Sequence, residues 1–145
     1  MKAKTAVSVV TANWKVGEVE QTCIRQPEDI YRVLQPLIAE LEQEAVCAIA
    51  LNIRNKIIGV RIVTLGTSTE SLVAPKETFR DAILLNASGL ILAHNHPSGD
   101  PSPSAEDLMV TRRMREAGVV LGIELLDHMI VTRDSYCSLK TEGLM

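Results

Sequence analysis

Two histidines stand one residue apart where an apolar run ends, in the stretch LAHNHPSGDPSPSAED that covers residues 92–107. In an extended chain, residues two apart point to the same side, roughly 6.5–7 Å apart at Cα. His94 and His96 can therefore reach one point beyond the apolar core, and two imidazoles so placed can bind one metal ion. Taken alone, the pair is more typical of loop histidines that make ordinary hydrogen bonds. A third ligand is needed to favour a metal site.

An acid that follows the histidines can supply that third ligand. Ser104 is expected to begin a helix and Asp107 lies three residues further on, so the pair also resembles a capping box, although that motif prefers Glu or Gln at the acid position. The helical period places Asp107 on the same face as Val110, Met114 and Ala117. An ionised carboxylate on an inward face is costly unless it is paired or bound to a cation. The two histidines and Asp107 thus form a candidate three-ligand set.

Three protein ligands and one water molecule are the arrangement of a catalytic zinc ion. Nitrogen and oxygen ligands make Zn²⁺ the first choice, and manganese, iron or cobalt could use the same set. The ion would lower the pKa of its bound water from 15.7 toward about 7. Such a site also needs a proton acceptor beside that water.

Helices with clear signals must position these ligands. The first begins at Pro27 and carries a helical apolar series that ends at Leu41. The second covers residues 75–86, with Phe79, Ala82 and Ile83 facing inward. The third runs from Ser104 to Ala117 and is closed by Gly118.

Strands are expected between these helices and before them. Residues 6–25 hold two β-rich pieces, AVSVVTA and VEQTCI, separated by a polar break at 15–17. Residues 45–51 form a buried central strand, joined as a hairpin to 57–65, and strands follow at 89–93, ending at His94, and at 122–131. The order of elements predicts an α/β (α+β) fold, one domain over 1–145 with a mixed sheet sandwiched by about three helices.

The composition excludes several classes of protein. Aromatic residues make up 3% of the chain and the formal net charge is −3, which argues against an unspecific nucleic-acid binder. Three widely spaced cysteines indicate neither a disulfide framework nor a cysteine zinc site and fit a reducing cytoplasm. The first residues lack the apolar region of a signal peptide, and no apolar stretch is long enough to cross a membrane. A cytoplasmic protein without membrane contact is the prediction.

The motif His94-x-His96-Pro97 followed by Ser104-x-x-Asp107 resembles the JAMM (MPN+) metalloprotease motif, HxHP followed by SxxD. The wider text, ILAHNHPSGDPSPSAEDLMVTRRMREAGVVLGIELLDHMIV, is similar to the RadC branch of that family. The likeness covers residues 27–145 and leaves 1–26 as an N-terminal extension that is expected to form strands. It implies a JAMM/MPN-like (cytidine-deaminase-like) fold and a zinc-dependent hydrolase in which a metal-bound water attacks an amide or isopeptide-like bond.

The resemblance also implies roles for single residues. The two histidines and Asp107 become the ligands of one zinc ion with its bound water. Glu44, just before the central strand, matches the family's general base, and Glu42 is the fallback. Ser104 would stabilise the oxyanion of a tetrahedral intermediate, while its competing role as helix N-cap stays open. Asn95 is expected to shape the loop, and His128 to be structural or a neighbour of the ligands.

Other functions remain as alternatives. RadC proteins are associated with DNA repair, so the chain could be a nuclease or a DNA-binding accessory of repair or recombination. The 26 residues before the match are too few for the helix-hairpin-helix module of many RadC proteins. DNA contact would then depend on Arg112, Arg113 and Arg115, for which a solvated helix face is the other explanation. A non-catalytic MPN scaffold is the third alternative. The peptide or protein substrate is unknown, and the edges of an aliphatic sheet are compatible with a homodimer.

Overall fold

Seven strands form one mixed sheet in the computed structural model of the protein, which describes residues 4–11, 14–66 and 73–145. The strands are β1 (Ala6–Thr11), β2 (Trp14–Glu20), β3 (Glu44–Leu51), β4 (Ile57–Gly66), β5 (Gly89–Asn95), β6 (Glu124–Val131) and β7 (Tyr136–Ser138). The helices are α1 (Pro27–Leu34), a π-helical turn (Gln35–Ala39), α2 (Pro75–Leu84) and α3 (Ala105–Leu121). No helix of the described residues is both long enough and apolar enough to cross a membrane.

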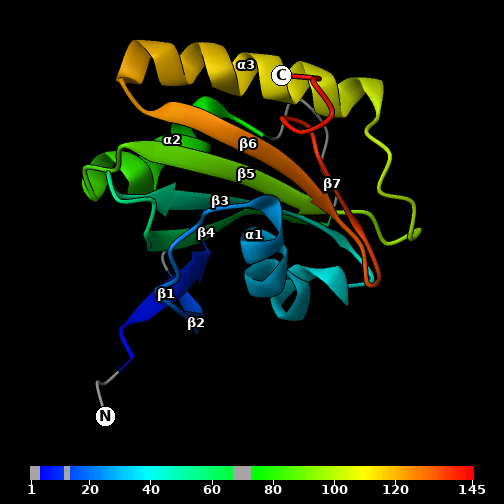
Figure 1. Ribbon diagram of the computed structural model, residues 1–145, viewed down its shortest axis with the longest axis horizontal. Coiled ribbons are helices and arrows are strands. Elements are labelled where there is room, and N and C mark those ends of the chain that lie inside the picture. The colour runs from blue at the N-terminus through cyan, green and yellow to red at the C-terminus, as the bar shows by residue number, and fades with distance from the viewer. Residues whose placement is uncertain (1–3, 12–13, 67–72) are drawn as a thin grey trace.

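The strand order is β2-β1-β4-β3-β5-β6-β7. β3 pairs antiparallel with both β4 and β5, and every residue of β3 after Glu44 is buried. β6 lies parallel to β5 and is reached through α3, whereas β1 is parallel to β4. These pairings confirm the predicted mixed sheet and the hairpin that joins its central strand to the next (Figure 1).

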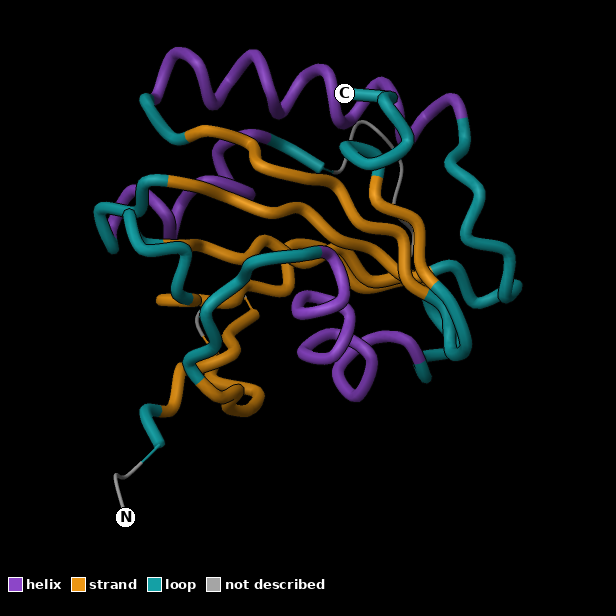
Figure 2. The backbone as a smooth tube through the Cα atoms, in the orientation of Figure 1, coloured by secondary structure: helices purple, strands orange, loops and turns teal. Residues whose placement is uncertain are grey.

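Helices cover both faces of the sheet (Figure 2). On one face, α1 and the π-helical turn pack over side chains such as Ile49, Ile91 and Met129. On the other face, α2 and α3 pack over the alternate residues, including Ala48 and Leu92. Successive residues of a strand point to opposite faces, so each central strand supplies both cores. This arrangement confirms the predicted fold class.

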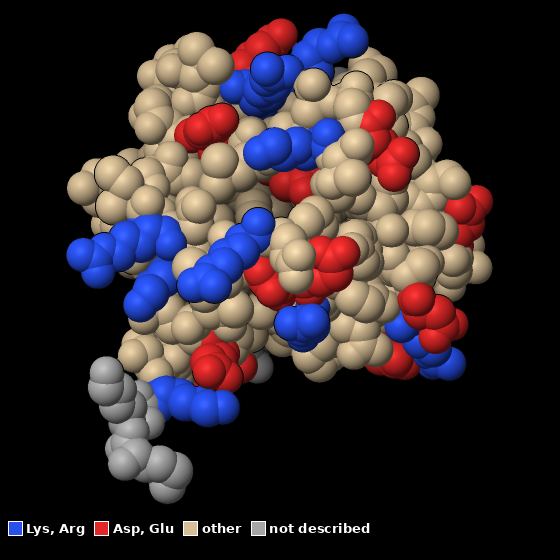
Figure 3. All heavy atoms as spheres, viewed as in Figure 1, with Lys and Arg blue, Asp and Glu red and all other residues tan. Residues whose placement is uncertain are grey.

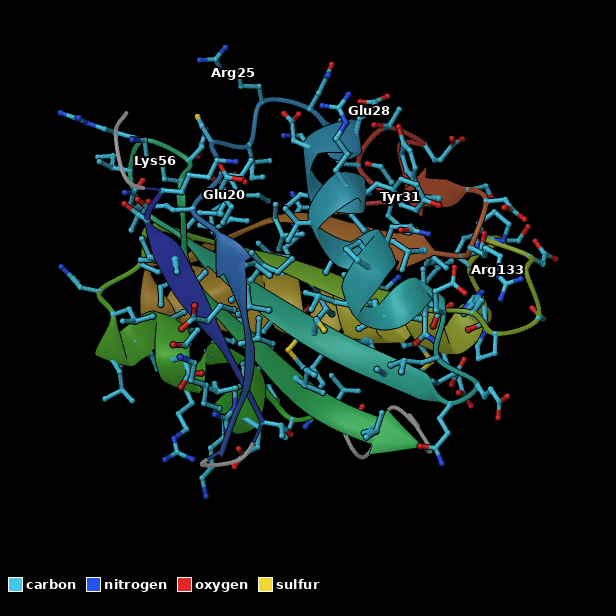
Figure 4. The ribbon with its side chains drawn as sticks, turned by 90° about the horizontal axis from the view of Figure 1, so that it is seen from below. Glu20, Arg25, Glu28, Tyr31, Lys56 and Arg133 are labelled. Atoms are coloured by element: carbon cyan, nitrogen blue, oxygen red, sulfur yellow. The ribbon has the colours of Figure 1, made fainter. Side chains whose placement is uncertain are left out.

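The first helix differs from its prediction. The apolar series was expected to form one helix that reaches Leu41, but α1 ends at Leu34 and a π-helical turn follows. Pro36 has no backbone N–H to donate, and its ring crowds the carbonyl of residue 32 one turn earlier. Figure 4 looks onto this face and shows α1 across the sheet. The Tyr31 hydroxyl donates to the carbonyls of Thr132 and Arg133, which ties α1 to the turn after β6.

Two expectations for the other helices are wrong. Ile83 was predicted to face inward, but it is 52% exposed, and Thr78 is buried with Phe79 and Ala82 instead. Gly118 was predicted to close the third helix, yet α3 continues to Leu121 and Gly122 is its left-handed C-cap. A Cβ atom on Gly118 would lie 2.4 Å from the backbone oxygen of Ile123. That glycine allows close helix–strand approach rather than helix termination.

The N-terminal strands form, but the second is displaced. The predicted polar break at 15–17 lies inside β2, which pairs antiparallel with β1. The predicted piece VEQTCI contributes only its first two residues to β2, and Cys23 makes an isolated bridge with Lys56. A solvent-facing outer strand tolerates polar residues, so a polar stretch alone does not mark its end.

Candidate metal centre

His94 is the last but one residue of β5 and points to the face that α2 and α3 cover. His96 follows the end of that strand, where its backbone N–H donates to the carbonyl of Val131. The two Nε2 atoms lie 2.9 Å apart. The strand pleat therefore brings the two imidazoles together as the sequence predicts.

Asp107 reaches the same point from the first turn of α3. One carboxylate oxygen lies 3.1 Å from His94 Nε2, and the other lies 3.3 Å from His96 Nε2. The carboxylate is anchored because Oδ2 also accepts the backbone N–H of Ser104 at 2.8 Å. The side chains of His94, His96 and Asp107 are 4%, 15% and 16% exposed, so the cluster lies at the rim of the core.

The donor atoms of these three residues fit a metal ion. One ligand atom from each lies within 4.8 Å of the others. In a tetrahedral zinc site, bonds of roughly 2.0–2.1 Å place ligand atoms about 3.3 Å apart. His96 Nδ1 lies 2.9 Å from the carbonyl of Asp100, which can only accept, so Nδ1 carries a proton and, in the neutral imidazole, Nε2 is an acceptor. An acceptor nitrogen beside a carboxylate and a second imidazole calls for a cation between them.

The electrostatics of the cluster agree with that reading. Burial raises the pKa of Asp107, but the close contacts of its carboxylate with the imidazoles of His94 and His96 outweigh that effect and hold the pKa well below its usual range. Contact with the Asp107 carboxylate raises the pKa of His96 against the opposing effect of burial. The carboxylate therefore stays ionised and presents its charge to the histidines.

Glu44 lies beside this cluster through the register of the sheet. Val46 pairs with His94 across β3 and β5, so Glu44, two residues earlier, points to the same face at the end of the strand. The negative charge of Glu44 contributes to the raised pKa of His96. Glu42 is exposed and precedes the strand. The geometry thus favours Glu44 over the fallback residue, while the role of general base remains a proposal.

Comparison with known proteins agrees with this geometry. A family model described as the RadC-like JAB domain matches residues 24–144. The chain belongs to the RadC-like JAB domain family. JAB/MPN domains include metalloproteases and often bind zinc.

Curated relatives carry the name UPF0758 protein. The relative from Moorella thermoacetica is 45% identical over 88% of this chain and 56% of its own length. That from Listeria monocytogenes is 40% identical over 98% of this chain and 65% of its own length. The relative from Thermotoga maritima is 47% identical over 79% of this chain and 51% of its own length. The chain therefore spans about half to two thirds of the length of these relatives.

Asn95 supports the backbone around Glu44, a role that the sequence did not predict. It was expected to shape the loop after β5, but its side chain is fully buried and points to the face opposite the histidines. There Oδ1 accepts the N–H of Ala45 at 2.6 Å, and Nδ2 donates to the carbonyls of Gln43 and Leu41. These bonds fix the backbone on both sides of Glu44. The alternation of side chains along a strand could have indicated this, because it places Asn95 on the face opposite His94. A buried amide there needs hydrogen-bond partners.

Ser104 occupies the N-cap of α3. Its Oγ accepts the backbone N–H of Asp107 at 3.1 Å, and the Asp107 carboxylate accepts the N–H of Ser104 in return. The capping box is thus formed with aspartate in place of the preferred glutamate. The role of Ser104 toward an oxyanion remains a proposal.

His128 lies beside the cluster in the buried part of β6. Its Nε2 is 2.8 Å from His94 Nδ1, and it is not one of the three grouped ligand residues. Burial lowers the pKa of His128 well below its usual range, because a buried site disfavours the charged imidazolium. Thr111, which contacts the other nitrogen of His128, was missed because nothing in the sequence shows which strand α3 covers.

Proposed function

We propose that this JAB domain is a zinc-dependent hydrolase that cleaves an amide or isopeptide-like bond. The convergence of His94, His96 and Asp107 on one point carries this proposal. When bound there, zinc acts as a Lewis acid and lowers the pKa of a coordinated water toward about 7.

The side chains divide the remaining work. His94 and His96 offer neutral nitrogen donors, and Asp107 offers the negative charge that a divalent cation requires. Glu44 stands at the same edge of the sheet and accepts the proton of the attacking water, then returns it to the leaving amine. Ser104 stands at the N-cap of α3, where its Oγ accepts the backbone N–H of Asp107, and its hydroxyl hydrogen would stabilise the oxyanion.

An amide substrate is favoured over nucleic acid by the charge distribution. Arg112, Arg113 and Arg115 are exposed on α3, but Figure 3 shows basic and acidic side chains interspersed on the face in view. A phosphodiester substrate is normally held by a continuous basic surface. The formal net charge of −3 points the same way.

Metal analysis and hydrolysis assays test the proposal in sequence. The purified chain is expected to hold one equivalent of zinc by elemental mass spectrometry, and Asp107→Asn is expected to lose it. Peptide and isopeptide libraries, read by mass spectrometry, should be cleaved by the wild type and not by Glu44→Gln. A wild-type chain without stoichiometric metal contradicts the proposal. Full metal loading without cleavage of any library member would favour the non-catalytic scaffold.

A further inference from the structure

Two buried side chains beside the metal centre have no role in the proposed hydrolysis. His128 lies on β6 and Thr111 on α3, and each is at most 2% exposed. We propose that they are positioning residues that fix the ring proton of His94 on Nδ1. The Nε2 lone pair of His94 then faces the metal position. This inference rests on the proposed function and adds a hydrogen-bond relay behind one ligand.

The direction of the relay follows from the single hydrogen of the threonine hydroxyl. Thr111 Oγ1 lies 2.7 Å from the backbone carbonyl of Asp107, one helical turn earlier. A carbonyl oxygen can only accept, so the hydroxyl donates its hydrogen there. The same Oγ1 lies 2.5 Å from His128 Nδ1. Because the hydroxyl hydrogen is already used, His128 Nδ1 must carry a proton and donate it to Thr111.

The next step depends on the neutrality of His128. Its side chain is buried, and the nearby Asp127 carboxylate is bound to the backbone N–H groups of His128 and Lys140 and to the Ser138 hydroxyl. The hydrogen bonds described for that carboxylate go to these groups and not to the imidazole ring, and a buried cation without an anionic partner is costly. With its proton on Nδ1, His128 therefore presents an acceptor at Nε2.

His94 must then be the donor to His128. The distance between His94 Nδ1 and His128 Nε2 is 2.8 Å, and a hydrogen bond requires one proton between them. His94 supplies it from Nδ1, which leaves its Nε2 unprotonated, 3.1 Å from Asp107. A metal-ligating histidine usually donates its other ring N–H to a partner that fixes its tautomer. Here that partner is a second histidine.

The relay begins and ends at Asp107. The backbone carbonyl of Asp107 receives the hydroxyl of Thr111, and its side chain is the third proposed ligand. A shift of α3 along the sheet would therefore disturb the carboxylate and the tautomer of His94 together. His96 reaches the same tautomer by a shorter route, through the carbonyl of Asp100.

Nitrogen-15 spectroscopy of the metal-free protein reads the relay directly. The chain has three histidines, two in the metal cluster and the third, His128, in contact with His94. Long-range ¹H–¹⁵N correlation spectra at alkaline pH, where imidazoles are neutral, distinguish protonated from unprotonated ring nitrogens. Protons on Nδ1 of both His94 and His128 are expected. A proton on Nε2 of either ring overturns the proposal.

Thr111→Val tests the relay with little change of shape. The hydroxyl is lost, so His128 should lose its preference for the Nδ1 proton and the zinc affinity should fall by about tenfold, the lower end for loss of such a partner. Thr111→Ser restores a hydroxyl and should restore the spectrum. Thr78→Val is the matched control, because Thr78 is also buried in a helix and donates to the carbonyl four residues earlier. It should change neither the spectra nor the zinc affinity.

Replacement of His128 gives an independent test. His128→Leu removes the acceptor for His94 and should weaken zinc binding about 10- to 100-fold. His128→Gln offers an amide oxygen toward His94 and an amide N–H toward Thr111, and should recover most of the affinity. Equal affinities for the wild type, Thr111→Val and His128→Leu would overturn the relay.

The relay and the proposed function can fail separately. If the wild-type chain binds no metal, the hydrolase proposal fails, but the metal-free spectra of the wild type and Thr111→Val still decide the tautomer of His94. If the wild type binds zinc and Thr111→Val leaves both the spectra and the affinity unchanged, the relay fails and the metal centre stands.

Discussion

The helices α1 and α3 have similar N-terminal turns but different roles. Each has an aspartate at its third position, Asp29 in α1 and Asp107 in α3, and both side chains are 16% exposed. Each carboxylate accepts the backbone N–H of the residue just before its helix. Beyond that bond they diverge, because Asp29 pairs with Arg32 at 3.8 Å, whereas Asp107 meets two imidazoles.

The difference shows what makes an anchored carboxylate into a ligand. The capping interaction is local and holds a carboxylate in a fixed position at the start of either helix. Only α3 starts beside the end of a strand that presents histidines on the same face. The loop of residues 96–104 sets that placement, and the cap then holds the acid still. Substitutions at the start of α3 and around its carboxylate should therefore affect the metal centre, whereas the matching change in α1 should not.

The largest contrast should come from Asp107→Asn set against Asp29→Asn. The first removes the anionic ligand and should abolish stoichiometric zinc binding, a larger loss than the 10- to 100-fold expected for a neighbouring group. The second should cost about 1 kcal/mol of unfolding free energy or less, through the helix dipole, and leave the metal in place. Elemental analysis and thermal unfolding measure both. Equal metal contents in the two variants would remove the distinction.

Glu44→Gln should separate metal binding from chemistry. The change keeps the size of the side chain and removes the proton acceptor, so hydrolysis should fall by about 10²- to 10⁴-fold with zinc content unchanged. Steady-state cleavage of a substrate found in the library screen, together with zinc titration, measures both quantities. Wild-type turnover in this variant would exclude Glu44 as the general base.

Asn95→Ala should lower the rate of hydrolysis through Glu44, although the Asn95 side chain lies on the opposite face of the sheet. Loss of the amide leaves the buried N–H of Ala45 unpaired, which should cost about 1–3 kcal/mol of unfolding free energy. Glu44 should then be held less firmly, so kcat should fall while zinc affinity is nearly kept. A denaturant titration beside the kinetic assay tests this. A loss of zinc without a loss of kcat per bound zinc would place Asn95 on the ligand side instead.

The smallest effect should come from the cap of α3. Ser104→Ala should lower the unfolding free energy by about 1 kcal/mol, and Ser104→Asn should regain most of it because asparagine also caps. Turnover separates the two roles of the serine. If the asparagine variant regains stability but not kcat, the hydroxyl acts on the reaction. If it regains both, Ser104 is only a cap.

The ligand set could be predicted from sequence because its spacing is local. The His-x-His pair follows the strand period, and Asp107 follows the helix period from Ser104. His128 and Thr111 could not be assigned, because their contacts depend on β6 lying beside β5 and on α3 crossing that pair. No periodicity within one element contains that pairing.

The fold was predictable to a similar limit. The central strands are long and apolar, and their signals override local detail. The interruption at Pro36 was masked by an unbroken apolar series on both sides of it. Gly118 was interpreted as a helix stop because glycine is common there, but packing against Ile123 determines its place. Local propensity fails where a contact from another element decides.

The close approach at Gly118 has a consequence for the opposite end of α3. Gly118 lies 11 positions after Asp107 in one continuous helix. At 1.5 Å per residue, about 16 Å of helix joins the two. A methyl group at position 118 would push the C-terminal part of α3 away from the backbone that leads into β6. The resulting tilt of the helix would displace Asp107 at its N-terminal end. Gly118, the smallest residue of α3, thereby helps to set the position of the Asp107 carboxylate about three turns away.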